Sequence, residues 1–376
     1  MEDHLFLAVF VLFQITFIVQ LYFIIIVQGR FRGYKGESPE KSEESGPTPV
    51  SVIICARNEE KNLVENLPSI FAQDYPLFEV VVVNDCSYDD SDVVLHEFAE
   101  KHANLKIVTL NEHALFKHGK KFAVTLGIKA ASYEHLLFTD ADCRPASDQW
   151  IRRMQQHFRG ETEIVLGYSP YESRRGLLNA HIRFETFYTA LNYFSFALRG
   201  RAYMGVGRNL SYTKSLFFRN KGFASHMHIP SGDDDLFVNE NSTPANTVIE
   251  ATDESHVWSK PKTTWKGYFN QKIRHMGAGR AYKTRDKRTL SLQVGSSVLF
   301  YIFLGLLGGL KPEWWYYFVG AYGLRLIAQL FVYYPTLKKL RYGDLFAWVP
   351  ALDLFYNLFI TVLSILSLFK KKVQWK

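Results

Sequence analysis

Acidic side chains follow three short apolar runs of this 376-residue chain, each at the point where the run ends. The runs, with the acids that follow them, are residues 50–55 with Glu59, 78–84 with Asp85, and 135–139 with Asp140 and Asp142. Each run predicts a buried strand. Ligands of open α/β sheets bind beyond the carboxyl ends of the strands, so we expect these carboxylates to meet at one edge of a sheet.

The spacing of Asp140 and Asp142 favours a metal site. An acidic or hydroxyl side chain after a strand often caps the next helix, which is a sufficient explanation for Ser87, Asp89 or Asp90. It fails for Asp140 and Asp142, because two carboxylates two residues apart after a buried strand cannot both cap. Mg²⁺ or Mn²⁺ takes oxygen ligands, usually one or two carboxylates plus substrate phosphates. The pair therefore predicts a cation that neutralises a diphosphate leaving group.

A second acidic cluster, Asp233-Asp234-Asp235, follows Gly232. Three consecutive carboxylates repel one another and need a cation, a basic partner or solvent. The cluster is typical of an exposed acidic turn or a helix start. It also suits a general base, which must lie within hydrogen-bond reach of the acceptor hydroxyl that it deprotonates. Both alternatives stay open from the residues alone.

Gln271 and Arg274 are three residues apart, which places them on one face of a helix. From there they could reach a diphosphate or a sugar. The basic residues that follow them, between positions 280 and 288, instead predict a juxtamembrane segment on anionic lipid. The two interpretations are compatible, so we assign Gln271 and Arg274 to the site and the later basic residues to the membrane.

The apolar runs alternate with helical patterns, which predicts an α/β domain whose parallel sheet is covered on both faces. The expected helices are residues 61–71, 91–102 and 120–131, and a further short strand is residues 106–110. Residues 173–200 form an aromatic-rich helical pattern. We interpret it as a core or interfacial helix, with a wall of an acceptor site as the alternative.

Residues 5–27 are almost wholly apolar and long enough to span a bilayer. The segment begins after two acidic residues, whereas a signal peptide has a basic start and a small-residue cleavage site. Arg30, Arg32 and Lys35 come directly after it. The positive-inside rule then predicts an N-terminus outside the membrane and a main domain in the cytoplasm.

The C-terminal third predicts a membrane region. Residues 294–310 and 314–334 are apolar runs joined by a Gly- and Pro-containing turn, and residues 345–369 form a third run before a lysine-rich tail. Three full crossings would place that tail outside, against its charge. We therefore predict that 345–369 is re-entrant or interfacial, because Pro350 and Asp353 are expensive in lipid.

Composition supports a membrane enzyme rather than a nucleic-acid binder. Apolar residues make up 47% of the chain and aromatic residues 15%, which suits lipid-facing surfaces. The net charge of +7 fits anionic lipid and phosphorylated substrates, because much of the excess lies beside apolar spans. Cys55, Cys86 and Cys143 have no metal-binding spacing and predict free thiols in a reducing compartment.

Together these motifs resemble glycosyltransferase family 2, which includes cellulose, chitin and hyaluronan synthases. The resemblance runs from about Val50 to His275 and implies the following roles. Ala56, Arg57, Glu59 and Asp85 bind the nucleotide, Lys120 lies near it, Asp140-Ala141-Asp142 is the metal-binding DxD motif, Gly232-Asp233-Asp234 is the catalytic motif, and Gln271-Lys272-Ile273-Arg274-His275 is the Gln-x-x-Arg-Trp motif.

Two departures from the family pattern affect the expected mechanism. The family's Thr-Glu-Asp motif makes Asp234 the catalytic base, but Thr and Glu are missing here, and a one-residue slip would give Asp233 or Asp235. His275 replaces the Trp that would contact the acceptor sugar. The membrane region is also short beside that of synthases with a translocation channel, so a single transfer to a lipid or lipid-linked acceptor is at least as well supported as processive synthesis.

The resemblance implies a GT-A fold over residues 50–290, preceded by a membrane helix (1–35) and a polar linker (36–49) and followed by a membrane region (291–376). It implies an inverting, metal-dependent transfer from a nucleotide-sugar, with a UDP-sugar favoured, to a lipid, lipid-linked or polysaccharide acceptor at the cytoplasmic face. One alternative is a membrane nucleotidyltransferase, although residues 56–61 lack the glycine-rich loop that holds a triphosphate. Another is a non-catalytic scaffold or transporter subunit.

Overall fold

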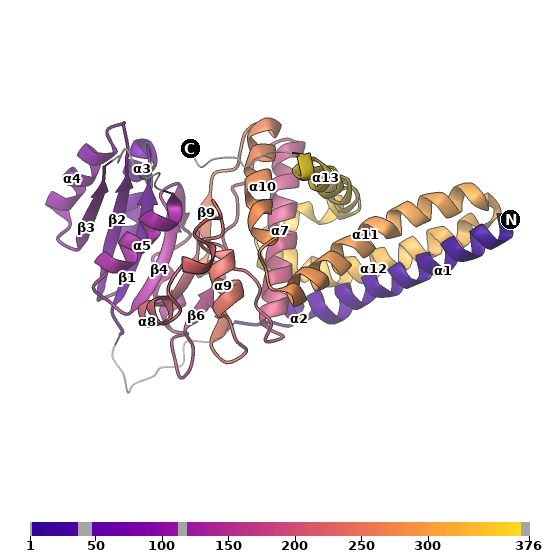
Figure 1. Ribbon diagram of the computed structural model, residues 1–376, viewed down its shortest axis with the longest axis horizontal. Coiled ribbons are helices and arrows are strands. Elements are labelled where there is room, and N and C mark those ends of the chain that lie inside the picture. The colour runs from indigo at the N-terminus through magenta and orange to yellow at the C-terminus, as the bar shows by residue number, and fades with distance from the viewer. Residues whose placement is uncertain (1, 37–46, 112–118, 370–376) are drawn as a thin grey trace.

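The computed structural model describes residues 2–36, 47–111 and 119–369. The strands that alternate with helices after residue 50 form one half of a seven-stranded sheet (Figure 1). The strand order is β3-β2-β1-β4-β7-β6-β8. The strands are β1 (Val50–Ala56), β2 (Phe78–Asp85), β3 (Leu105–Leu110), β4 (His135–Asp140), β6 (Ile164–Leu166), β7 (Leu210–Thr213) and β8 (Thr247–Ile249).

The first four strands are parallel, as the sequence predicts, and their carboxyl ends meet at one edge. Cys55 at the end of β1 pairs with Asp140, and Ala56 pairs with Asn84. The other half of the sheet differs from the expected all-parallel sheet. Strand β7 runs antiparallel to β4 and to β6, so the sheet is mixed. These strands are only three or four residues long, which is too short for a periodic pattern in the sequence.

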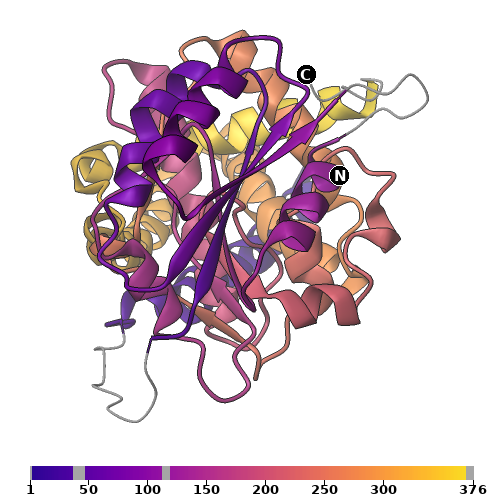
Figure 2. The same cartoon turned by 90° about the vertical axis from the view of Figure 1, so that its left-hand side faces the viewer.

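Alternate side chains of the central strands pack on opposite faces of the sheet, as the two-residue period of a strand requires. Val52 and Ile54 lie in the core under α3 (Glu60–Phe71), and Ile53 lies in the core under α5 (Lys120–Ala130). The remaining helices of the domain are α4 (Ser91–Lys101), α6 (Trp150–Gln155), α8 (Lys214–Arg219) and α9 (Asp235–Asn241). Figure 2 shows the twisted sheet between its helices. The domain is thus α/β with both faces covered.

Two long helices lie between the sheet and the projecting bundle of apolar helices (Figure 1). They are α7 (Leu177–Ala197) and α10 (Trp265–Gly279). Most side chains of α7 are buried, including Phe184, Phe187 and Phe194. The helix therefore belongs to the core, in agreement with the first interpretation of its aromatic pattern. A small ribbon of β5 (Cys143–Pro145) and β9 (Val257–Ser259) completes the domain.

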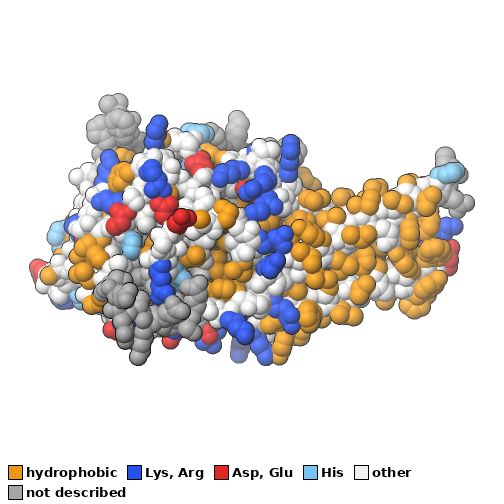
Figure 3. Space-filling view, turned by 90° about the horizontal axis from the view of Figure 1, so that it is seen from below, with side chains coloured by type: hydrophobic (Ala, Val, Ile, Leu, Met, Phe, Trp, Pro, Cys, Tyr) orange, Lys and Arg blue, Asp and Glu red, His pale blue; other side chains and the backbone are white. Residues whose placement is uncertain are grey.

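Helices from both ends of the chain form a bundle that projects from the domain (Figure 1). The N-terminal helix α1 (Glu2–Leu21) continues through a wider, π-type segment (Tyr22–Gln28) into α2 (Gly29–Arg32) and packs against α11 (Thr284–Leu310) and α12 (Trp315–Lys339). Segments His4–Arg32, Thr284–Leu310 and Gly343–Leu366 are long and apolar enough to cross a membrane. Apolar side chains cover the outer surface of the bundle (Figure 3).

The last helix, α13 (Val349–Phe369), lies across the base of the bundle and packs against α7, α10 and α11. Its Asp353 is buried and accepts a hydrogen bond from Arg325 of α12 at 2.9 Å and one from Gln329 at 2.8 Å. The carboxylate that would be costly in lipid is therefore paired inside the protein. The lysine-rich tail, residues 370–376, lies outside the described residues.

Candidate active site

Asp140 and Asp142 lie together beyond the carboxyl end of β4. One oxygen of each carboxylate and the sulfur of Cys143 lie within 4.8 Å of one another. Burial raises the pKa of the Cys143 thiol well above its usual range, and the thiol donates to Asp142 Oδ1 at 3.3 Å. The donor set for a cation is therefore the two carboxylates. Oxygen ligands of this kind fit Mg²⁺ or Mn²⁺, which take their remaining ligands from water and substrate phosphate.

Lys120 connects this pair to the second acidic cluster. Its Nζ lies 2.9 Å from Asp140 Oδ1 and 3.3 Å from Asp233 Oδ2. Burial raises the pKa of Asp140, but the Lys120 ammonium outweighs this effect and holds that pKa below its usual range. The two acidic motifs are nearly one hundred residues apart in sequence. The Lys120 ammonium lies between them and contacts both.

The three consecutive aspartates have three different environments. Asp233 contacts Lys120, while Asp234 is the N-cap of α9 and accepts from the backbone N–H groups of Gly207 at 2.7 Å and Asp235 at 2.8 Å. Asp235 accepts from the hydroxyl of Tyr282 at 2.7 Å, and burial together with Asp234 raises its pKa to about 8. The cluster therefore forms the start of α9 and also contributes carboxylates to the site.

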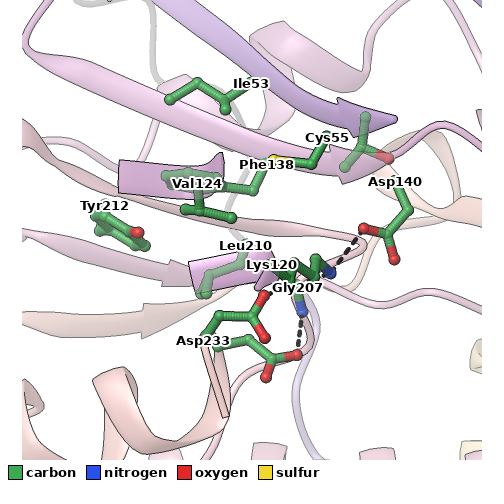
Figure 4. A pocket seen from close by; sticks show the side chains of 12 residues that line it. Ile53, Cys55, Lys120, Val124, Phe138, Asp140, Gly207, Leu210, Tyr212 and Asp233 are labelled. Carbon is green, nitrogen blue, oxygen red and sulfur yellow. Dashed lines mark hydrogen bonds and ion pairs between the residues drawn. The ribbon is translucent and has the colours of Figure 1, made fainter. Parts of the chain in front are cut away.

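A pocket lies between the two acidic motifs (Figure 4). Its floor is apolar and its rim carries Lys120 and three carboxylates. The lining residues are Ile53, Cys55, Lys120, Val124, Phe138, Thr139, Asp140, Gly207, Leu210, Tyr212, Asp233 and Asp234. Asp235 is not among them. Within this pocket Asp233 and Asp234 face Asp140, the first carboxylate of the metal pair Asp140 and Asp142, whereas Asp235 is bound to Tyr282.

The residues predicted to hold the nucleotide lie in the neighbouring loops after β1 and β2. These loops are tied together, because Asn58 N–H donates to Ser87 Oγ at 3.0 Å and its side-chain oxygen accepts from Tyr88 N–H at 2.8 Å. Burial, and then the charge of Asp142, raise the pKa of Glu59, which shows that Glu59 is close to the metal pair. Ala56 and Asp85 are buried and Arg57 is half-buried. Their contact with a nucleotide stays a prediction.

Gln271 and Arg274 lie on α10, as their spacing predicts. Gln271 Nε2 donates to the hydroxyl of Tyr171 at 3.4 Å, and the backbone carbonyl of Arg274 accepts from Ser231 Oγ at 3.1 Å. The Arg274 charge contributes to the lowered pKa of Asp140. This helix is therefore attached to the acidic loop and brings a guanidinium toward the metal pair.

Arg208 is a residue of the site that the sequence motifs do not indicate. It follows Gly207 of the pocket wall, and its guanidinium lies 4.3 Å from the ring centroid of Tyr171. The charges of Asp140 and Asp142 both act on it. The available signal in the sequence is the preceding pair of glycines, Gly205 and Gly207. A Cβ at Gly207 would lie 3.2 Å from Asp234 Oδ2, so this loop must pass close to the acidic cluster.

Comparison with known proteins identifies the family of this domain. Residues 51–221 match the family model described as glycosyl transferase family 2. This segment is a glycosyltransferase family 2 domain. The match confirms the family that the motifs indicate, whereas a particular relation to cellulose, chitin or hyaluronan synthases stays a prediction. The matched segment ends at residue 221, before the Asp233–Asp235 cluster and before Gln271 and Arg274 of α10.

Individual relatives are similar over a part of their length. The poly-beta-1,6-N-acetyl-D-glucosamine synthase of Staphylococcus epidermidis is 33% identical over 102 residues, which are 27% of this chain and 24% of the synthase. The probable glycosyltransferase YdaM of Bacillus subtilis is 31% identical over 142 residues, 36% of this chain and 34% of that protein. The chain thus spans about a quarter to a third of these curated relatives.

A solved structure confirms the fold class over nearly the whole chain. The structure of a mannosyltransferase from Pyrobaculum calidifontis, in complex with GDP-Man and Mn²⁺, superposes with a TM-score of 0.57 at 17% sequence identity. The alignment covers 95% of this chain and 99% of that one. The fold is therefore GT-A with accompanying long apolar helices.

Proposed function

We propose that the chain is a metal-dependent glycosyltransferase that moves a sugar from a nucleotide-sugar to an acceptor at a membrane surface. The observation that carries this proposal is the pocket in which Asp140, which lies beside Asp142 at the end of β4, faces Asp233 and Asp234 across Lys120. One side of this pocket suits a diphosphate with its cation, and the other suits a hydroxyl that must lose a proton. The family of the domain and the GT-A fold support the same reaction.

Within this reaction Asp140 and Asp142 would hold Mg²⁺ or Mn²⁺, which supplies positive charge to the departing diphosphate. Lys120 would keep the opposing carboxylates together and place a second cation beside the phosphate. Glu59 and the tied loops after β1 and β2 would bind the nucleoside. A UDP-sugar remains the favoured donor by resemblance, and GDP-Man in the Pyrobaculum calidifontis mannosyltransferase structure makes a guanosine diphosphate sugar the first alternative.

The geometry favours Asp233 over Asp234 as the base. Both oxygens of Asp234 already accept backbone hydrogen bonds, which fix the start of α9 and the Gly207 loop. The Asp233 carboxylate lines the same pocket but is held there by the Lys120 ammonium. We therefore assign proton transfer from the acceptor hydroxyl to Asp233 and the shaping of the pocket to Asp234. Direct attack by that hydroxyl on the anomeric carbon would invert its configuration.

The membrane region supports an acceptor that is lipid or lipid-linked, with the catalytic domain in the cytoplasm. Basic side chains gather between the domain and the apolar bundle (Figure 3). This basic belt comprises the helix-end residues Arg30, Arg32, Arg199, Lys283, Arg285, Lys287, Arg288, Lys338 and Lys339. Cationic residues are retained on the cytoplasmic side and attract anionic lipid. Helix α13, which lies across the base of the bundle, would then rest at this surface.

This topology predicts which sites an impermeant thiol reagent can reach in intact cells. Glu313→Cys, at the turn between α11 and α12, is expected to be labelled from outside, whereas Glu161→Cys on the domain and Lys371→Cys in the tail are protected until the membrane is opened. A chain without its three native cysteines is the background. Labelling of Lys371→Cys in intact cells would show that α13 crosses the bilayer, and labelling of Glu161→Cys would place the domain outside.

The proposed reaction is tested with the purified full chain in lipid vesicles. UDP- and GDP-sugars are each supplied with Mn²⁺ and a membrane lipid extract, and release of the nucleoside diphosphate is measured together with sugar incorporation into lipid. We expect both products, with inversion at the anomeric carbon, and loss of both with EDTA. Retention of configuration would contradict the single displacement. Absence of transfer from every donor would contradict the function itself.

A further inference from the structure

Arg208 is a half-buried arginine with few hydrogen bonds. Its Nη2 donates to the backbone carbonyl of Ser169 at 3.4 Å, and the face of its guanidinium lies over Tyr171. Its Nη1 is fully buried and has no hydrogen-bond partner within the described part of the chain. A guanidinium carries five N–H donors in a planar fork. An arginine with a purely structural role would direct these donors to protein acceptors, since an unmade buried hydrogen bond is costly.

The support beneath this guanidinium is rigid. Tyr171 donates its backbone N–H to the hydroxyl of Tyr342 at 2.6 Å, and that hydroxyl donates to the Tyr171 carbonyl at 3.1 Å. Gln271 of α10 holds the Tyr171 hydroxyl. On the other side, the backbone of Gly207 is fixed by Asp234. The position of Arg208 is thus set by α10, by the chain just after α12 and by the acidic cluster at once.

Arg208 directly follows Gly207 of the pocket wall and is near the metal carboxylates. Its charge acts on Asp140 and Asp142, together with the charge of Arg274 in the case of Asp140. The ion pair that the structure shows at Asp140 is with Lys120, and none joins Arg208 to an acidic residue among the described side chains. The Arg208 guanidinium is therefore close to the metal carboxylates without being bound to them. Its N–H donors could bind an anion, such as a phosphate group, that is coordinated to the metal.

We propose that Arg208 binds the diphosphate of the nucleotide-sugar and, with Arg274, stabilises it as it leaves. This inference rests on the proposed function. As the bond between the anomeric carbon and the diphosphate oxygen breaks, the electron pair stays on that oxygen, and the proton of the acceptor hydroxyl passes to Asp233. Arg208 keeps its own protons and donates hydrogen bonds to phosphate oxygens. Arginine suits this role because its planar fork binds phosphate oxygens in pairs.

The test compares Arg208→Gln with Arg219→Gln, which removes a surface arginine at the end of α8 that pairs with Glu163. Calorimetry with Mn²⁺ measures binding of UDP, GDP and inorganic pyrophosphate, and of UMP and GMP as ligands that lack the second phosphate. We expect Arg208→Gln to raise the Kd of the diphosphate ligands by roughly 10- to 100-fold, as loss of charge-assisted hydrogen bonds implies. In Arg208→Gln the Kd of the monophosphates should change less than about threefold. In Arg219→Gln the Kd of every ligand should change less than about threefold.

Arg208→Lys is the second variant and keeps the charge without the planar fork. It should recover a part of the diphosphate affinity while the thermal transition stays at the wild-type temperature, so that misfolding is separated from lost binding. Unchanged diphosphate binding in Arg208→Gln, with a functional wild type, overturns this inference alone. An equal loss for monophosphates and diphosphates also overturns it. If the wild-type chain binds none of these diphosphates with Mn²⁺, the inference and the proposed function fall together.

Discussion

Asp233→Asn is expected to lower kcat by about 10²- to 10⁴-fold, the usual contribution of a general base. The amide has the same size as the carboxylate but cannot accept the proton of the acceptor hydroxyl. The Kd of the nucleotide-sugar should change little, because the metal pair and α10 are untouched. The measurements are kcat from release of the nucleoside diphosphate and the donor Kd from calorimetry.

Asp234→Asn is the matched comparison and separates the two candidates for the base. Its amide nitrogen would meet the backbone N–H of either Gly207 or Asp235, so we expect a loss of about 1–3 kcal/mol in the free energy of unfolding. Its kcat should fall less than that of Asp233→Asn. The opposite order, with near-normal kcat in Asp233→Asn, would return the base to Asp234, the residue that the family resemblance favours.

Asp142→Ala is expected to abolish metal-dependent transfer and to weaken donor binding as well. The variant lacks one of the two carboxylates at the end of β4, and the diphosphate then loses the cation that holds it. The variant should still fold, because Asp142 is partly exposed and its described hydrogen bond is with the Cys143 thiol. Donor Kd with and without Mn²⁺, together with activity under EDTA, measures both effects.

Asp148→Ala provides the control, because this surface aspartate lies six residues further on and accepts from the side chain of Gln149. It should keep the activity and the EDTA sensitivity of the wild type. Full activity of Asp142→Ala, or wild-type activity that EDTA leaves unchanged, would remove the metal from the mechanism. The two predictions also differ from each other, since Asp233→Asn affects kcat and Asp142→Ala affects donor binding too.

The elements that were predictable from the sequence are those with a repeated pattern. β1, β2 and β4 are continuous apolar runs, and α3, α4 and α5 begin and end within one residue of the expected positions. The other half of the sheet, with its one reversed strand β7, was not predictable, because β6 and β8 have three residues each and obtain their burial from the sheet they join. The three cysteines are free, as expected from their positions.

In the candidate site, too, the residues with a local pattern were predictable and those that depend on distant contacts were not. Asp140, Asp142 and the Asp233–Asp235 cluster were found because carboxylates after a strand, or in a row, are unusual in a local window. The ranking within the cluster depends on Lys120 and Gly207, which are distant in sequence. Arg208 was missed because a single arginine in a loop carries no signal of its own, and the glycines before it indicate only that the backbone passes close to another segment. Its surroundings come from Tyr171, Gln271 and Tyr342, which only the fold brings together.

The bundle joins the two ends of the chain, and this has a consequence for biosynthesis. Gln20 of α1 donates to Ser296 and to the backbone of Gln293, partners that are synthesised more than 270 residues later. In the proposed topology α1 stands in the bilayer with polar side chains unsatisfied until α11 arrives. The GT-A domain would then be made between two insertion events, and the site can acquire its Tyr342 support only after α12 has followed. Contacts of such long sequence separation form slowly, so maturation of the site is expected to be the last step of folding.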